Sequence, residues 1–295
     1  MVYQSVIAGL VTALCWGTAD FTSRSQSERM GYYKTIIYSM LVTLAVLIPL
    51  TPIVSPDLVA PAIPLFALVI AGVLNFIAFT FLYRAFHRGV VSVVAPVAYT
   101  YPAITTVLSI ILLGTFLSIV QALAIAGIIL GVTLTSTRLS ELRQSASGKG
   151  APNLTAGFVP ALLAAAFFGT VYVGVGYAAP VVSLVIPVMV LRITGISVGA
   201  LLAPVLKEDI RPSRAIFSKG LLFMGVLEAI GFISLTYGIS VPGGSLPVVT
   251  AISGMGGAVA ASYGLVLLKE RLELNQILGV VLSLLGVFAL LYLGG

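Results

Sequence analysis

A few side chains in this sequence could bind or transfer charge, although each lies within a long apolar stretch. Glu228 offers a carboxylate that can accept a proton or a cation. Arg192 offers a guanidinium that could bind an anionic group or, alternatively, neutralise Glu228. Trp16 and Asp20 are four residues apart, so they share one face of a helix. The indole can stack on an aromatic or cationic ligand, and the carboxylate can act as a gate, accept protons, or pair with Arg24.

The composition identifies the elements that must position these groups. Of the 295 residues, 59% are hydrophobic and 8% are charged, whereas a soluble domain carries about 25% charged residues. This composition excludes a soluble globular enzyme, because so few charges cannot form a water-facing surface. A helix that spans a bilayer needs about 20 apolar residues, so the chain has room for ten such helices joined by short connections. We therefore predict an all-α polytopic membrane protein.

Apolar runs separated by polar or proline-containing breaks predict ten transmembrane helices. Their residue ranges are 5–23, 33–51, 64–83, 90–113, 118–137, 154–176, 184–206, 217–238, 245–268 and 274–293. Helices fit better than a barrel because the runs are continuously apolar and do not alternate with period two. The count depends most on the fourth and fifth spans, which a short loop joins, and on the ninth, which glycine and proline interrupt.

The basic residues predict how the chain is oriented. Fourteen of the 15 lysines and arginines fall in the connections that follow odd-numbered spans, and Arg192 is the exception. Basic residues mark the cytoplasmic loops of membrane proteins. The pattern therefore predicts a multi-pass protein of the cell membrane with both termini outside. It also accounts for the formal charge of +6 without a nucleic-acid partner.

The two halves of the chain resemble each other in order. Residues 16–18 align with 168–170, and residues 71–79 align with 224–232. We expect a first five-helix repeat at 1–137, a cytoplasmic linker at 138–153 and a second five-helix repeat at 154–295. Because five is odd, the second repeat must cross the membrane in the opposite sense. Inverted repeats are typical of secondary transporters, whose substrate site lies near the bilayer midplane between the repeats.

This alignment adds a partner for the best candidate residue. Asn75 occupies the position in the first repeat that Glu228 occupies in the second. Nine residues separate Glu228 from Lys219, or about 13 Å along a helix, which places the carboxylate near mid-membrane. We expect Asn75 and Glu228 to face each other across a central cavity. The structural alternative is that Glu228 is neutral or salt-bridged within the protein.

Further candidates are tyrosines and helix-breaking residues. Tyr99 and Tyr172 are placed where buried hydroxyls could line the cavity. Proline and glycine interrupt spans 4 and 9, which occupy corresponding positions in the two repeats, and paired broken helices indicate a transport site. The predicted hinge or cavity-backbone residues are Pro96, Pro102, Pro247, Gly254 and Gly256.

The segment 264–272, GLVLLKERL, followed by Gln276 and Gly279, resembles the drug/metabolite transporter superfamily, specifically the EamA-type transporters. The aromatic-Gly-Thr at 16–18 and Arg192 resemble that family's repeat as well. The resemblance implies a proton- or exchange-driven carrier of small metabolites with a cavity lined by spans 1, 3, 4, 6, 8 and 9. The first repeat departs from the pattern because it lacks charges at 114–116. The family's termini are often cytoplasmic, whereas the charge pattern here places them outside.

We therefore expect a secondary active transporter, with export favoured, that moves amino acids or amphipathic or cationic compounds by alternating access, either proton-coupled or by exchange. The alternatives are a channel and a regulatory membrane subunit. One histidine and one cysteine supply neither a nucleophile with its base nor a metal cluster, so we expect no enzyme activity, no cofactor and no metal. The expected partners are the lipid bilayer, a small-molecule substrate, and protons or a counter-substrate. The chain is expected to act as a monomer or a weak homodimer.

Overall fold

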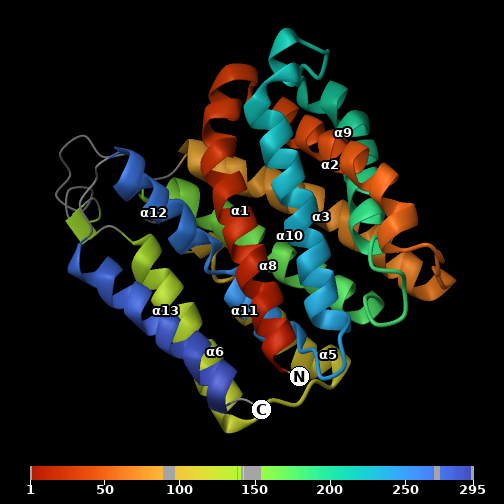
Figure 1. Ribbon diagram of the computed structural model, residues 1–295. Helices are drawn as coiled ribbons and strands as arrows, with labels where there is room; N and C mark the ends of the chain where they lie inside the picture. Colours follow the sequence, from red (N-terminus) through yellow and green to blue (C-terminus); the bar gives the residue numbers. More distant parts are fainter. Residues whose placement is uncertain are drawn as a thin grey trace.

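The computed structural model describes residues 2–88, 97–137, 139–140, 142, 154–268 and 273–293, which form helices joined by turns and loops and contain no strand (Figure 1). The helices of the first half are α1 (Val2–Met30), α2 (Tyr32–Val54), α3 (Ala62–Arg88), α5 (Tyr101–Leu113) and α6 (Ile119–Ser136). Those of the second half are α8 (Leu154–Ala178), α9 (Ile186–Leu206), α10 (Lys219–Ser240), α11 (Leu246–Ser253), α12 (Gly256–Leu268) and α13 (Leu274–Leu293), with a short 3₁₀ turn at Arg214–Phe217.

Eight of the described helices are long and apolar enough to cross a membrane. The fourth and ninth predicted spans differ from this pattern, so ten continuous membrane-spanning helices are not confirmed. The fourth is described from residue 97, and its helix α5 has 13 residues, with Pro102 in the first turn, where proline's missing N–H costs no hydrogen bond. The ninth is split into α11 and α12 because the helix is interrupted around Gly254 and Met255. Pro96 lies outside the described residues.

The predicted short connection between the fourth and fifth spans forms a sharp corner. Gly114 ends α5 with a φ of 64°, a left-handed conformation that glycine adopts without a steric penalty. Ser118 then begins α6 with a capping box, in which its hydroxyl accepts the Gln121 backbone N–H and the Gln121 side chain accepts the Ser118 N–H. Two strong local signals therefore separate the fourth span from the fifth.

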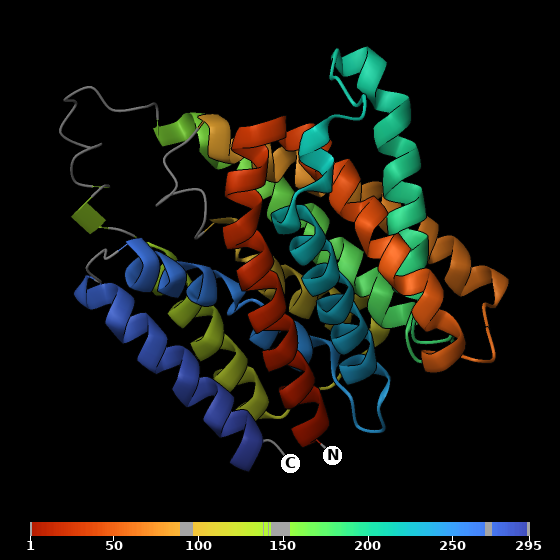
Figure 2. The same cartoon turned by 45° about the horizontal axis from the view of Figure 1, so that its top comes forward.

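Each helix of the first half packs against a helix of the second half. The pairs are α1 with α10, α3 with α8, α2 with α9, α5 with α11, and α6 with α13. The α6–α13 pair lies along one side of the bundle, with α2 and α9 on the other (Figure 2). In both views α1 begins and α13 ends at the same end of the bundle. The core between the halves therefore holds side chains that are far apart in sequence.

The opposite end of the bundle is tied together by the loop between α9 and α10. Lys34 binds Asp209 at 3.0 Å, and the Tyr32 hydroxyl donates to Glu208 at 2.9 Å. Lys34, expected in the first loop, lies buried in the first turn of α2. The Arg211 backbone N–H and then the Lys34 ammonium hold the pKa of Asp209 below its ordinary value. This contribution to stability is present above the ordinary aspartate pKa and is lost as pH falls through the lowered value.

The close contact between α6 and α13 supports a mutational prediction. A Cβ added at Gly131 would lie 2.6 Å from the Gly279 carbonyl oxygen on α13, whereas at Gly127 the nearest atom would be Leu282 Cδ1 at 3.9 Å. We expect Gly131→Ala to destabilise the protein by about 1–3 kcal/mol, because α6 must move away from α13. The matched variant Gly127→Ala should leave stability unchanged or slightly raised, since glycine disfavours helix. Thermal unfolding in detergent measures the stability of both variants. Equal unfolding midpoints for the two variants would show that the contact between Gly131 and α13 does not limit the residue size at this position.

Candidate functional site

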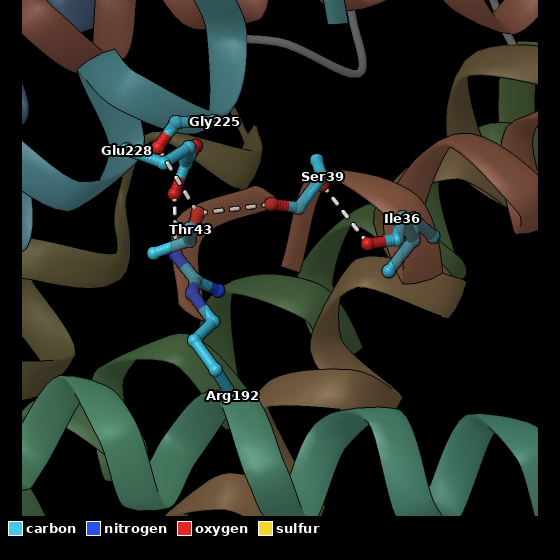
Figure 3. A network of polar contacts seen from close by, with 6 residues as sticks. All are labelled: Ile36, Ser39, Thr43, Arg192, Gly225 and Glu228. Carbon is cyan, nitrogen blue, oxygen red and sulfur yellow. Dashed lines mark hydrogen bonds and ion pairs between the residues drawn. The ribbon is translucent and has the colours of Figure 1, made fainter. Parts of the chain in front are cut away.

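A buried ion pair between α9 and α10 lies at the centre of the candidate site. An Arg192 Nη atom donates to Glu228 Oε2 at 2.5 Å, and the two side chains are 2% and 9% exposed (Figure 3). The Arg192 guanidinium carbon lies 4.5 Å from the centre of the Phe232 ring, a cation–π contact. Phe232 follows Glu228 by one helical turn, so both contacts to Arg192 come from the same face of α10. In this arrangement Arg192 neutralises Glu228, as the structural alternative predicted.

A polar network fixes α2 beside this pair. The Thr43 hydroxyl lies 2.9 Å from the Ser39 carbonyl oxygen and 3.1 Å from that of Gly225, and it can donate its one proton to either (Figure 3). Ser39 Oγ in turn donates to the Ile36 carbonyl at 2.9 Å. Gly225 lies one turn before Glu228 on α10, and a Cβ there would lie 2.6 Å from Val42 Cβ. The close approach of α2 and α10 therefore positions Glu228.

A small cavity brings the ionisable candidates together. Asp20 of α1, Arg192 of α9 and Glu228 of α10 line it. The other lining residues, from α2, α3 and α10, are Ile36, Ser39, Met40, Phe79, Tyr83 and Met224. Its volume of about 10 Å³ is about the space of one water molecule. Spans 1, 3 and 8 line the cavity as the family resemblance implied, but spans 2 and 7 replace spans 4, 6 and 9.

The Asp20 carboxylate bonds to a tyrosine in the turn that precedes α5. The Tyr99 hydroxyl donates to Asp20 Oδ2 at 3.0 Å, which is the only partner of this carboxylate among the described residues. A Cβ at Gly257 would lie 2.8 Å from the Tyr99 ring, so α12 supports the ring from behind. The alternative partner, Arg24, has a side chain outside the described part of the structure. Tyr99 therefore bonds to Asp20 and positions it.

Trp16 lies in an aromatic cluster next to the ion pair. Its ring centre is 4.8 Å from that of Phe232 and 5.7 Å from that of Tyr172. Tyr172 lies 5.1 Å from Tyr101, whose hydroxyl shares a hydrogen bond of 3.1 Å with Ser253 Oγ. Trp16 Nε1 is buried without a hydrogen-bond partner among the described groups. Trp16 and Tyr172 are therefore in the core beside the cavity and do not line it.

Asn75 does not lie opposite Glu228 in this cavity. It is fully buried on α3, and neither amide atom has a hydrogen-bond partner in the described structure. It lies one turn before Phe79, which does line the cavity. One turn earlier still, Ala71 Cβ would lie 3.1 Å from a Cβ at Gly174 of α8. The dense α3–α8 contact therefore covers this part of α3, and the predicted facing pair is wrong for this cavity.

The interruptions of the two broken spans meet each other. A Cβ at Gly254 would lie 2.9 Å from Pro102 Cγ, so the break between α11 and α12 touches the start of α5. A Cβ at Gly256 would lie 3.3 Å from the Gly17 backbone nitrogen of α1. Pro247 lies in the first turn of α11, where it begins the helix and does not bend it. Pro102, Gly254 and Gly256 thus form one crossing point, one turn along α1 from Asp20.

Several residues of the site were missed by the sequence reasoning. Phe232 contacts the ion pair and Tyr83 lines its cavity, whereas Thr43 bonds to the Gly225 carbonyl one turn before Glu228, and Tyr101 lies in the aromatic cluster. The sequence spacing could have identified Phe232, because it follows Glu228 by four residues and therefore lies on the same face of the helix. No sequence pattern distinguishes Thr43 and Tyr83, because hydroxyl residues are common in apolar helices. Only the packing of the helices places these two near the site.

A family model described as the EamA-like transporter family matches the chain twice, at residues 4–137 and 155–292. The chain belongs to the EamA-like transporter family. An uncharacterised protein of Methanocaldococcus jannaschii is 30% identical over 132 residues, which are 45% of this EamA-family chain and 96% of that protein. A solved structure titled "Crystal structure of protein" covers 98% of this chain at 16% identity, with a TM-score of 0.76. That likeness concerns the fold alone.

Membership of this family makes the chain a multi-pass membrane transporter with two EamA repeats. The two matched stretches leave residues 138–154 between them. Eleven of the twelve predicted site residues lie in described helices or turns of the two repeats, and Arg192, Glu228 and Asp20 share one cavity.

Proposed function

We propose that this EamA-family protein is a secondary active transporter that moves small metabolites across the cell membrane by alternating access. The buried Arg192–Glu228 pair, next to a cavity that also contains Asp20, is the observation that carries this proposal. Ionisable groups inside a membrane protein are costly and mark substrate or proton pathways. A cavity of about 10 Å³ is far below the several hundred Å³ of a small-molecule site. Substrate binding therefore requires the helices to move apart.

The helix contacts support two inverted five-helix units at 1–137 and 154–295, joined by a cytoplasmic linker at 138–153. In such units, each helix of the first half has an equivalent five spans later, so α1 is equivalent to α8 and α3 to α10. The α1–α10 contact is then equivalent to the α3–α8 contact. Each of the other three pairs joins a helix to its own equivalent. A two-fold arrangement of repeats has this property. The relative whose nearly full length matches 45% of this chain also supports a unit of this size. We propose that the linker and the other basic connections are cytoplasmic and that both termini are outside.

The charges of the site suggest which chemical groups a substrate carries. Arg192 can hold a carboxylate or another anionic group once Glu228 is protonated. Asp20 and Glu228 can hold a cationic group, and the aromatic rings beside them suit flat or amphipathic compounds. We propose amino acids or amphipathic cations as substrates, with Glu228 as the proton or cation acceptor and with export as the favoured direction. Exchange of one substrate for another is the alternative to proton coupling.

A screen followed by a flux assay tests this function. Purified protein is heated with pools of metabolites, and compounds that raise the unfolding midpoint are then tested for counterflow in proteoliposomes. We expect saturable uptake that is accelerated by unlabelled substrate on the opposite side, because an alternating-access carrier returns faster when loaded. Flux that does not saturate and shows no counterflow would instead indicate a channel. Protein-free liposomes, and liposomes with Glu228→Gln protein, provide the controls.

A further inference from the structure

We propose that Asp20 is the proton-access residue of the cavity, which passes a proton through one water molecule to Glu228. This inference rests on the proposed function, in which Glu228 is the proton acceptor, and adds the route by which the proton arrives. Asp20 lies ten residues before the end of α1 at Met30, about 15 Å from the end of the bundle that carries the basic loops. Tyr99 is the positioning residue that holds the Asp20 carboxylate towards the cavity.

One cavity connects the two carboxylates. Asp20 and Glu228 line the same cavity, whose volume of about 10 Å³ is about that of one water molecule. One water can hydrogen-bond to two carboxylates at once, so it can carry a proton between them. Asp20 is partly buried, whereas Glu228 is buried. We therefore assign Asp20 as the first of the two carboxylates to take up the proton.

The two carboxylates have different partners. Glu228 is ion-paired with Arg192, whereas the described partner of Asp20 is a neutral hydroxyl. Among the described residues, the charged or titratable groups around the two carboxylates are Tyr83, Tyr99, Tyr101, Tyr172, Arg192 and, from α1 next to Gly231, Cys15. Arg192 Nε is buried without a hydrogen-bond partner among the described residues. The guanidinium thus has an unused donor beside the cavity, which suits an anionic group of a substrate.

The step balances without any other reactant. The protonated Asp20 gives its proton to the water oxygen, and the water gives another proton to Glu228 Oε, which leaves Asp20 ionised again. Protonation of Glu228 removes the negative charge that holds Arg192, so the guanidinium becomes available to substrate. A proton fits this site better than a metal ion, because the described residues contain no group of three or more His, Cys, Asp or Glu side chains that could hold one.

Trp16 provides a built-in reporter for the test. It is the sole tryptophan of the sequence, and its ring packs on Phe232, one turn after Glu228. A Cβ at Gly231 would lie 2.6 Å from Trp16 Nε1, so the indole touches the α10 face that carries Glu228. A change in the charge of Glu228 or Arg192 should therefore change the Trp16 emission.

The experiment is a stopped-flow acid jump on the full-length protein in liposomes, with the proton as the probe and Trp16 emission as the readout. We expect Asp20→Asn to slow the emission change by about tenfold or more while its final amplitude stays as in the unmodified protein. Glu228→Gln should remove the amplitude. Tyr99→Phe should slow the change because Asp20 is no longer oriented. The matched control is Tyr263→Phe, which loses a hydroxyl bonded to Thr18 on α1, the helix that carries Asp20. This variant should show the same rate of emission change as the unmodified protein.

Each deviating outcome has a distinct meaning. An unchanged rate in Asp20→Asn would show that the proton reaches Glu228 by another route and would overturn the proposal, although the proposed transport function would stand. Loss of the final amplitude in Asp20→Asn would show a structural role and would overturn it too. If Glu228→Gln kept its amplitude, Glu228 would not be the acceptor. If Asp20→Asn does not fold, two other comparisons test the proposal. Asp20→Glu keeps a carboxylate and should keep the fast emission change. Tyr99→Phe should slow the change while Tyr263→Phe does not, and equal rates in these two variants would overturn the proposal.

Discussion

Glu228→Gln is expected to reduce substrate flux in proteoliposomes by about tenfold or more and to remove its dependence on pH. The amide has the shape of the carboxylate but cannot take up a proton in the same way. The substitution also removes the negative charge that pairs with Arg192 at 2.5 Å. Protonation can therefore no longer determine whether the guanidinium is paired within the protein or available to substrate. Counterflow of the identified substrate at several pH values, with and without an imposed proton gradient, measures both effects.

Two variants make this result specific to Glu228. Glu208→Gln changes a glutamate in the loop after α9, where the Tyr32 hydroxyl can still donate to the amide oxygen, and should transport normally. Glu228→Asp keeps a carboxylate with a shorter reach and should retain pH dependence at a lower rate. If Glu228→Gln transported normally and kept its pH dependence, the coupling role of Glu228 would be wrong.

Arg192→Met is expected to lower the free energy of unfolding by about 3–5 kcal/mol. Removal of the guanidinium leaves the buried Glu228 carboxylate without its ionic partner, and also removes the cation–π contact with Phe232. The double variant Arg192→Met with Glu228→Gln should recover most of this loss, because a neutral amide is far cheaper to bury than an unpaired charge. Both variants should be inactive in counterflow. Unfolding in detergent, followed by Trp16 emission, measures the stabilities.

The same substitution at an exposed position is the matched control. Arg214→Met, in the exposed turn after α9, should change stability by no more than about 0.5 kcal/mol. A double-mutant cycle then gives the coupling between Arg192 and Glu228 directly. If the two losses simply add and the double variant is the least stable, the pair contributes no coupling and the ion pair is not what holds these side chains in place.

Much of the architecture followed from hydropathy and charge in the sequence. Eight of the ten predicted spans are long apolar helices, because the cost of exposing backbone polar groups to lipid makes helices the default in such runs. Of the remaining two spans, span 4 carries proline and span 9 carries glycine and proline, and span 9 is split around Gly254. The local sequence locates such a break, but the length of the helix on either side depends on what packs against it. Gly254 of the second half packs against Pro102 of the first half, and no local sequence pattern predicts that contact.

Hydropathy, charge and motif indicate the family, the apolar helices and the short set of ionisable side chains inside them, since these are properties of residues close together in the sequence. The pairing of these side chains depends instead on how the helices pack. The packing placed Arg192 on Glu228, 36 positions away, and Tyr99 on Asp20, 79 positions away. It also removed Asn75 from the cavity, although Asn75 aligns with Glu228 in the repeat. The physical reason is that partners are selected by the rotation and close approach of packed helices, which depend on small residues such as Gly225 and Gly231 at distant positions.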